Sequence, residues 1–327
     1  MNKEKSSYIK FKNCLIIATN SGRYKVKNLD NNDVFFALPK GLLAYNIVNT
    51  KSTLYEPVTS SNKTETKIIK TTPKVGDLVT VEVSGDKYLI SEIEPRKNKL
   101  TRPDVANVDQ ILLVFSCVEP VFDFILFDKF LTILTQNNLN SCLFVSKIDK
   151  INEDNLKVLK SKLNYYESAL KIEIKYLNHK TVNLDNLKNI FNNKITVLAG
   201  QTGVGKSTLI NSLAPDLNIK TQGISHALGR GKHTTRDAMF YEIGGGYIAD
   251  TPGFSKIDFG IMKADELKNY FSDFLELSIN CKFSNCNHIN EPNCAVKNAV
   301  QNDLILISRY ENYVKFFGEL SKSVIKY

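Results

Sequence analysis

A ten-residue segment at positions 199–208, AGQTGVGKST, constrains this chain more than any other feature. It meets the pattern G-x-x-x-x-G-K-[ST], in which glycines let successive backbone N–H groups curl around an anion. The run before it, KITVLA (194–199), is rich in β-branched residues, and KSTLINSLA (206–214) has the pattern of a helix whose positive end faces the anion. The order strand, glycine-rich loop and helix predicts a phosphate-binding loop rather than a turn that binds nothing.

Each position of this loop has an expected role at a nucleotide. Lys206 should reach the β- and γ-phosphates, where its charge would also favour hydrolysis, and the Ser207 hydroxyl should bind Mg²⁺. The loop by itself does not distinguish ATP from GTP. Seven more residues of the loop are expected to contact the nucleotide: Gly200, Gln201, Thr202, Gly203, Val204, Gly205 and Thr208.

Guanine recognition requires a carboxylate that accepts from N1–H and the exocyclic amino group, and a lysine that packs over the base. GTPases place both in an N-K-x-D motif, and none follows the loop here. Upstream, the apolar run SCLFVSKID (141–149) ends as an α/β ligand site requires. Asp149 would read the base and Lys147 would pack on it. Ser146 stands where Asn is usual, so a contact to the base or to the phosphate loop is lost or replaced.

The segment YIADTPGF (247–254) predicts a strand that ends in the form D-x-x-G. At such a position Asp250 would hold Mg²⁺ through water, and the N–H of Gly253 would sense the γ-phosphate. The next residue is often a glutamine that orients the attacking water. Here it is Phe254, which cannot hydrogen-bond, so we expect slow intrinsic turnover.

Between the phosphate loop and D-x-x-G lies a long, polar, glycine-rich segment, TQGISHALGRGKHTTRD (221–237), where a switch I loop would stand. Thr234 or Thr235 would supply a second hydroxyl to Mg²⁺. His233 beside them is the candidate that positions the attacking water, and a solvated histidine on a surface loop is an equal alternative.

The motifs occur in an unusual order. A second base-contacting loop would follow the strand-like run KIEIKYLNHKT (171–181). The chain therefore presents the base reader, the base loop, the phosphate loop, switch I and D-x-x-G in turn, whereas a standard GTPase begins at the phosphate loop. This order predicts a circularly permuted, Ras-like GTPase domain.

The N-terminal segment has the pattern of a small β-barrel. Turn signals such as Ser21-Gly22 and Gly85-Asp86 separate short strand-like runs, while the polar, lysine-rich segment 58–74 is expected to be a loop. The number of runs suits a barrel of the OB type, although an SH3-like barrel would have the same pattern. The five runs are residues 8–19, 23–29, 33–38, 77–83 and 87–93.

Positive charge is concentrated in that segment. Residues 1–102 hold 18 Lys and Arg against 10 Asp and Glu, residues 103–262 hold 17 against 16, and residues 263–327 hold 8 against 8. A localised basic excess is typical of a protein that binds nucleic acid, although a merely soluble basic surface is the alternative. The stretch PRKNKLTRP (95–103) reads as a basic linker after the barrel.

Three of the six cysteines lie with one histidine in CKFSNCNHINEPNC (281–294). The spacing C-x4-C-x-H-x5-C predicts a closed, structural zinc site with no open position for water, the alternative being a chance grouping of reduced thiols. The expected ligands of this single ion are Cys281, Cys286, His288 and Cys294. The other three cysteines, in apolar runs, are expected to be small buried hydrophobic residues: Cys14, Cys117 and Cys142.

Together these motifs resemble the RsgA family of ribosome-small-subunit-dependent, circularly permuted GTPases over essentially the whole chain. The resemblance implies an OB-fold at 1–102, a permuted GTPase domain at 103–262 and a mostly helical zinc domain at 263–327. It further implies GTP and GDP as ligands with Mg²⁺, hydrolysis stimulated by the small (30S) ribosomal subunit, contact with its rRNA, and a role in late maturation of that subunit. A histidine at the place of His233 also fits the family.

Other features limit the alternatives. The longest clean apolar run, ILLVF (111–115), is far too short for a membrane span, and no signal peptide is recognisable, so we expect a cytoplasmic protein. Nothing indicates a stable oligomer, so we expect a monomer. Two other functions stay open: an RNA-binding assembly module with GTP as a structural ligand, and an ATP-specific kinase. Multiple turnover and nucleotide competition would distinguish them.

Overall fold

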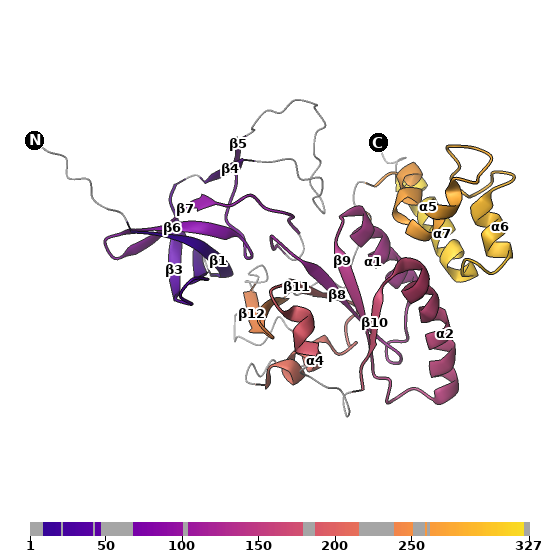
Figure 1. Ribbon diagram of the computed structural model, residues 1–327, viewed down its shortest axis with the longest axis horizontal. Coiled ribbons are helices and arrows are strands. Elements are labelled where there is room, and N and C mark those ends of the chain that lie inside the picture. The colour runs from indigo at the N-terminus through magenta and orange to yellow at the C-terminus, as the bar shows by residue number, and fades with distance from the viewer. Residues whose placement is uncertain are drawn as a thin grey trace, which may run out of the picture. The chain divides into compact units, whose positions relative to one another are not determined.

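The computed structural model in Figure 1 describes most of the chain, namely residues 9–20, 22–41, 43–46, 68–100, 104–178, 187–215, 239–250, 259 and 262–323. Contacts divide it into two compact units. The first comprises Met1–Asp109, Leu184–Leu198 and Ser207–Gly253, and the second comprises Gln110–Asn183, Ala199–Lys206 and Phe254–Tyr327. The division into three domains at 102 and 262 stays a prediction.

A five-stranded barrel forms the N-terminal part of the first unit, which confirms the predicted fold. It closes because β1 pairs antiparallel with both β2 and β6, while β3 pairs parallel with β7. Val26, Val81 and Ile90, from three of these strands, are fully buried inside. The strands are β1 (Lys10–Asn20), β2 (Arg23–Asn28), β3 (Val34–Pro39), β6 (Leu78–Ser84) and β7 (Lys87–Ile93).

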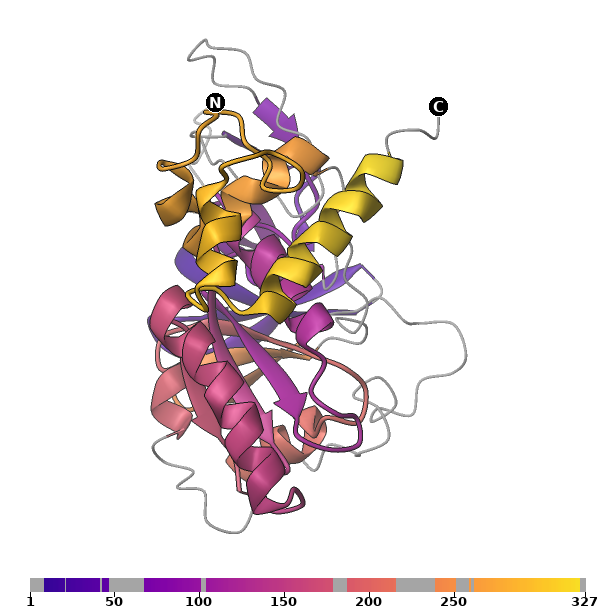
Figure 2. The ribbon, with the colours of Figure 1, turned by 90° about the vertical axis from the view of Figure 1, so that its right-hand side faces the viewer.

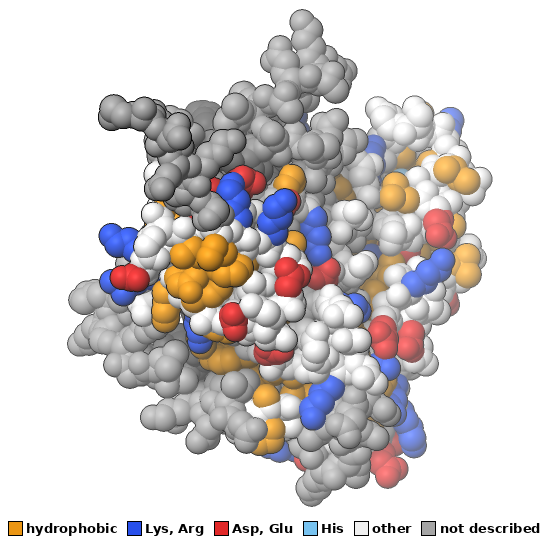
Figure 3. Space-filling view, turned by 60° about the vertical axis from the view of Figure 1, so that its left-hand side comes forward, with side chains coloured by type: hydrophobic (Ala, Val, Ile, Leu, Met, Phe, Trp, Pro, Cys, Tyr) orange, Lys and Arg blue, Asp and Glu red, His pale blue; other side chains and the backbone are white. Residues whose placement is uncertain are grey.

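The outer face of the barrel carries an exposed apolar row. Val34, Phe36 and Leu38 alternate along β3 and are 49%, 56% and 41% exposed. Lys25 of β2 is the register partner of Phe36, so a basic side chain adjoins the most exposed ring. Figure 3 shows apolar side chains gathered on this side of the molecule, with Lys and Arg side chains beside them.

A short two-stranded sheet differs from the expectation for residues 58–74. β4 (Ala44–Asn46) pairs antiparallel with β5 (Ile68–Lys70), so three residues of the supposed loop form a strand. Two adjacent isoleucines, which favour extended backbone, account for it. Residues 58–67 of that segment lie outside the described residues.

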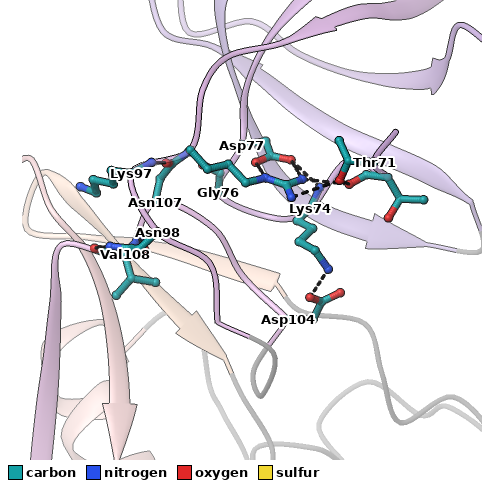
Figure 4. Close-up of polar contacts among 11 residues, drawn as sticks. Thr71, Lys74, Gly76, Asp77, Lys97, Asn98, Asp104, Asn107 and Val108 are labelled. Atoms are coloured by element: carbon teal, nitrogen blue, oxygen red, sulfur yellow. Dashed lines mark hydrogen bonds and ion pairs between the residues drawn. The ribbon is translucent and has the colours of Figure 1, made fainter. Parts of the chain in front are cut away.

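Residues of the basic linker after the barrel are held by hydrogen bonds and ion pairs (Figure 4). Arg96 is buried, and its Nε and Nη2 donate to the two oxygens of Asp77 at 2.6 and 2.7 Å. Asn98 pairs with both backbone groups of Val108 through its side chain. Lys74 contacts Asp104 in the same region. Several positive charges counted from the sequence are therefore already neutralised.

Three further strands and a helix lie wholly or mostly in the first unit. They are β11 (Ile195–Ala199), β12 (Met239–Ile243), β13 (Gly246–Asp250) and α4 (Lys206–Leu213), which begins at the end of the phosphate loop. β11 runs parallel to β13, and β13 pairs antiparallel with β12. β12 joins the barrel because Met239 pairs with Ala18 of β1, and Lys27 Nζ lies 2.6 Å from the Glu242 carboxylate.

The second unit is built on three parallel strands in the order β10-β9-β8. They are β8 (Gln110–Ser116), β9 (Asn140–Ser146) and β10 (Glu173–Tyr176), connected by α1 (Phe124–Gln136) and α2 (Glu153–Leu170). Every residue of β8 is buried, as expected for a parallel strand covered on both faces. The side chains of Asp123 and Asn152 cap the two helices by accepting from backbone N–H groups.

Helices make up the C-terminal part of the second unit. They are the 3₁₀ segment η3 (Ala264–Tyr270) and helices α5 (Ser272–Ser278), α6 (Ala295–Gln301) and α7 (Ile307–Ser323). Figure 2 shows α7 in yellow as the longest of them. Tyr313 and Phe316 of α7 are buried, so these aromatic residues form a packing face. Among the described residues, no helix combines the length and apolar character needed to cross a bilayer.

Candidate functional site

The phosphate-binding loop stands where the sequence predicts it, between β11 and α4, and its glycines have backbone angles that other residues avoid. The φ angles of Gly200, Gly203 and Gly205 are +137°, +83° and +100°. A Cβ atom on Gly200 would lie 2.1 Å from the carbonyl oxygen of Val114. The first glycine of the motif is therefore required for both conformation and space.

Lys206 turns back onto its own loop. Its Nζ donates to the carbonyl oxygens of Gly200 at 2.7 Å and Gln201 at 2.6 Å. Burial lowers the pKa of Lys206 to about 8, because the ammonium has lost contact with water. Such a cation would be stabilised by phosphate oxygens.

Ser146 occupies the position where GTPases usually have asparagine, and its hydroxyl bonds to the phosphate loop. Ser146 Oγ lies 2.5 Å from the carbonyl oxygen of Val204 and 3.3 Å from that of Phe115. A hydroxyl has one proton, so the shorter contact takes it. Ser146 and Val204 are both buried. The base-reading segment and the phosphate loop are therefore joined within one unit despite the substitution.

The two residues expected to read the base follow directly. Lys147 has a left-handed backbone with φ of 59°, and its Nζ donates to the carbonyl oxygen of Glu119. Asp149 is exposed, so its carboxylate is available to a ligand. Burial, and then the charge of Asp149, raise the pKa of the Cys117 thiol to about 11, so a buried neutral thiol lies beside this carboxylate.

Helix α1 adds a contact to the phosphate loop that no motif indicated. Asp123 caps α1 because its Oδ1 accepts from the Leu126 N–H at 3.0 Å. Its other oxygen, Oδ2, accepts from the Gln201 side-chain amide at 3.5 Å. One carboxylate therefore adjoins both a helix start and the phosphate loop.

Of the other residues predicted for the nucleotide site, the structure describes only some. Ser207 is the second residue of α4, and Asp250 is the last residue of β13. Gly253 lies outside the described residues, as do the three switch I candidates, His233, Thr234 and Thr235. Their roles stay predictions.

The four predicted zinc ligands converge; Cys281, Cys286, His288 and Cys294 are here called the Cys/His cluster. Their ligand atoms all lie within 4.8 Å of one another. Cys281 Sγ is 3.9 Å from Cys294 Sγ, and His288 Nδ1 is 3.3 Å from Cys294 Sγ and 3.7 Å from Cys281 Sγ. Zinc bonds of about 2.3 Å to sulfur and about 2.0 Å to nitrogen, arranged tetrahedrally, require spacings of about 3.5 to 3.8 Å. The donor set and its geometry fit one such ion.

Burial shifts the pKa values of two residues of the cluster. Burial lowers the pKa of His288, which keeps its imidazole in the neutral form that ligates metals. Burial raises the pKa of Cys286 to about 12, so this thiol would release a proton on binding a cation. Glu291 is partly desolvated, yet the backbone N–H groups of Asn287 and Ile289 hold its pKa below the usual range.

A buried arginine joins the C-terminal helices to α1. Arg309 of α7 is 2% exposed, and its Nη1 donates to Asp128 Oδ1 of α1 at 2.6 Å. Its Nε and Nη2 donate to the carboxylate of Asp273 in α5 at 2.6 and 2.9 Å. Sequence analysis missed this ion pair network, because Arg309 and Asp128 stand far apart in the chain and neither belongs to a motif.

Comparison with known proteins places these features in one family. The sequence model described as RsgA GTPase matches residues 93–260. A protein of Onion yellows phytoplasma, named "Small ribosomal subunit biogenesis GTPase RsgA", is 47% identical over 315 residues, covering 96% of this chain and 99% of the relative.

Two solved structures have the same fold. One is described as the crystal structure of YloQ, a circularly permuted GTPase, and matches with a TM-score of 0.74 at 30% identity over 100% of both chains. The other is the crystal structure of YjeQ from Thermotoga maritima, with a TM-score of 0.73 at 30% identity over 95% of this chain and 99% of that one. The circular permutation predicted from motif order is thereby confirmed.

Proposed function

Because the chain belongs to the RsgA GTPase family and hydrolyses GTP, we propose that it binds the small ribosomal subunit, acts in its late maturation, and is stimulated by it. The relatives named for small-subunit biogenesis cover nearly the whole chain, which supports this partner. The bond from Ser146 to Val204 supports the nucleotide-binding part of this proposal, since it joins the proposed base reader to the phosphate loop.

Guanine selectivity in this proposal comes from the exposed carboxylate of Asp149, which accepts from the guanine N1–H and amino group. Lys147 packs over the base, and Ser146 holds the phosphate loop rather than touching the base. Gly200 to Thr208 surround the phosphates, with Lys206 exchanging its two loop carbonyls for phosphate oxygens.

Magnesium and the switch residues complete this proposed site. Ser207 and one of Thr234 or Thr235 hold Mg²⁺ directly, and Asp250 holds it through water. The ion supplies charge neutralisation at the β- and γ-phosphates. His233 positions the attacking water, because Phe254 cannot. In a His233→Ala variant, stimulated turnover should be lost while GTP affinity stays within about twofold of wild type.

The test is phosphate release from GTP and from ATP, with and without purified small ribosomal subunits. We expect multiple turnover of GTP that the subunits strongly accelerate, and no turnover of ATP. Equal GTP rates with and without subunits would contradict the proposed partner. Comparable ATP turnover would contradict the role of Asp149 as the base reader.

For contact with rRNA, we propose the outer face of the barrel. Arg23, Lys25 and Lys87 are exposed there beside the apolar row of β3, and no ion pair among the described residues involves these three cations. Phosphate contacts of this kind weaken with salt. A double variant, Arg23→Gln with Lys25→Gln, should bind the subunit more weakly and with a shallower salt dependence. Lys157→Gln on the exposed face of α2 is the matched control, and equal effects from both would refute this surface.

We further propose that the Cys/His cluster holds one structural Zn²⁺ and that the protein acts as a monomer. The convergence of four donor atoms supports the first statement. Metal analysis of the purified protein should give one zinc per chain, and light scattering should give the mass of a single 36.9 kDa chain.

A further inference from the structure

Helix α7 is hydrogen-bonded on one side to the segment that carries the Cys/His cluster. The hydroxyl of Tyr310 donates to the carbonyl oxygen of His288 at 2.8 Å, and that of Tyr313 donates to the carbonyl oxygen of Asn287 at 2.8 Å. His288 is itself one of the four cluster residues. The position of α7 therefore depends on the loop that a bound ion would order.

The same helix is bonded to α1 through one buried carboxylate. Asp128 is fully buried, and its Oδ1 accepts from Arg309 Nη1 while its Oδ2 accepts from Asn312 Nδ2, both at 2.6 Å. Tyr166 of α2 donates to Oδ2 at 3.2 Å. A buried charge with this many partners strongly resists displacement, because moving it leaves unpaired polar groups in a dry interior. Helices α7 and α1 are therefore expected to shift together.

Helix α1 begins at the phosphate loop. Its capping residue Asp123 accepts from the side chain of Gln201, and the carbonyl oxygen of Gln201 accepts from Lys206 at 2.6 Å. Hydrogen bonds and ion pairs made by α7 and α1 thus connect the Cys/His cluster to the phosphate loop, and all these residues belong to the second unit.

We propose that Asp128 and Arg309 are positioning residues that couple the Cys/His cluster to the phosphate loop. Zinc in the cluster then strengthens nucleotide binding, and bound nucleotide slows the loss of zinc. The effect is reciprocal, because a coupling free energy between two sites has the same value from either side. This inference rests on the proposed zinc and nucleotide sites. The coupling is tested by measurements at both sites.

The first experiment measures the affinity of the full chain for a fluorescent GDP analogue, with zinc bound and after removal by a chelator. We expect removal to weaken binding by roughly fivefold or more, the usual lower range for coupled sites. In the Asp128→Asn variant an amide replaces an acceptor that faces the Asn312 amide, so removal should change affinity by less than about twofold. The second experiment follows zinc release to a coloured chelator, which should be slower with GDP in wild type and equal with and without GDP in the variant.

The matched control is Glu319→Gln. Glu319 of α7 lies 3.7 Å from Lys129 of α1 at the surface, so this variant removes an exposed contact between the same two helices. It should keep the wild-type response to zinc. Unchanged nucleotide affinity after zinc removal from wild type would overturn the coupling. An equal loss in wild type and Asp128→Asn would overturn the assignment to Asp128.

A less disruptive variant tests the same proposal if Asp128→Asn does not fold. Tyr310→Phe keeps the ring and removes only the hydrogen bond to His288, so it should reduce the effect of zinc on GDP affinity while its circular dichroism stays that of wild type. A full wild-type effect in Tyr310→Phe would count against the route through α7. A chain that binds GDP but holds no zinc would instead refute the proposed metal site, and the coupling with it.

Discussion

Ser146 Oγ lies 2.5 Å from the carbonyl oxygen of Val204, so the end of β9 is tied to the phosphate loop by a side chain shorter than the usual asparagine. A serine can make this bond because the loop approaches closely: a Cβ atom on Gly205 would lie 3.9 Å from the same hydroxyl. The contact that asparagine would make to the loop is thus replaced rather than lost.

Ser146→Ala should therefore weaken nucleotide binding. The buried carbonyl of Val204 would lose its donor, which costs about 1–3 kcal/mol, and we expect about a tenfold rise in the GDP dissociation constant. Ser141→Ala, in the same strand but less buried, is the control and should bind GDP as wild type does. Titration with a fluorescent GDP analogue measures both, and equal affinities for wild type and Ser146→Ala would show that the bond does not shape the loop.

Gly200→Ala should abolish nucleotide binding. Its Cβ would meet a backbone oxygen at 2.1 Å, and backbone cannot move aside as the end of a flexible side chain can. Gly318→Ala is the control, since nothing lies within 4 Å of the Cβ it adds in α7, and alanine should stabilise a helix by up to about 1 kcal/mol. Calorimetry would detect both effects, and measurable GDP binding by Gly200→Ala would contradict the loop geometry.

Nucleotide binding should take up a proton in mildly alkaline solution. In the free protein, burial lowers the pKa of Lys206 to about 8, whereas phosphates in contact with the ammonium would raise it. Affinity should thus be constant below about pH 8 and fall by up to about tenfold per pH unit above it, until the higher pKa of the complex is reached.

Calorimetry in buffers with different ionisation enthalpies measures the protons taken up. We expect almost no proton uptake on nucleotide binding near pH 6.5 and a clear proton uptake near pH 9. The folding stability of the free protein changes with pH in the opposite direction to the nucleotide affinity. A lowered lysine pKa contributes stability at high pH that is lost as pH falls from 10.5 towards 8. Absence of proton uptake at pH 9 would mean that Lys206 stays charged in the free loop.

Cys286→Ser should remove zinc and destabilise the C-terminal helices. An ion present at about 1,000 times its dissociation constant stabilises by about 4 kcal/mol, which corresponds to a fall of roughly 10 °C in the melting temperature of the second unit. Cys142→Ser, at a buried cysteine of β9 outside the cluster, should keep one zinc per chain. A full zinc content in Cys286→Ser would exclude Cys286 as a ligand.

Local patterns were sufficient for most strands and helices. The strand-like runs of the barrel and the apolar runs of β8 and β9 each depend on a few neighbouring residues, so they could be predicted from the sequence. The Cys/His cluster is also local, because its four ligands lie within one short segment. Motif order indicated the permutation, since the order of sites around the nucleotide survives when the chain is rejoined.

What could not be predicted depends on partners distant in the chain. Arg309 has no sequence feature that distinguishes it from an exposed arginine, and only folding brings it to Asp128 and Asp273. Arg96 is similar: the sequence counts it among free positive charges, yet it is buried against Asp77. The fate of Ser146 was also open, because whether serine can replace asparagine depends on how near the phosphate loop approaches.

The pairing of Arg309 with Asp128 also has a consequence in time. The two residues are separated by 181 positions, so Asp128 is synthesised well before Arg309. At about 5 to 20 residues per second this delay is roughly 10 to 40 s. Until α7 has left the ribosome that makes it, α1 lacks the cation that pairs with Asp128 in the folded protein. The contacts between α1 and α7 can therefore form only after α7 has been synthesised.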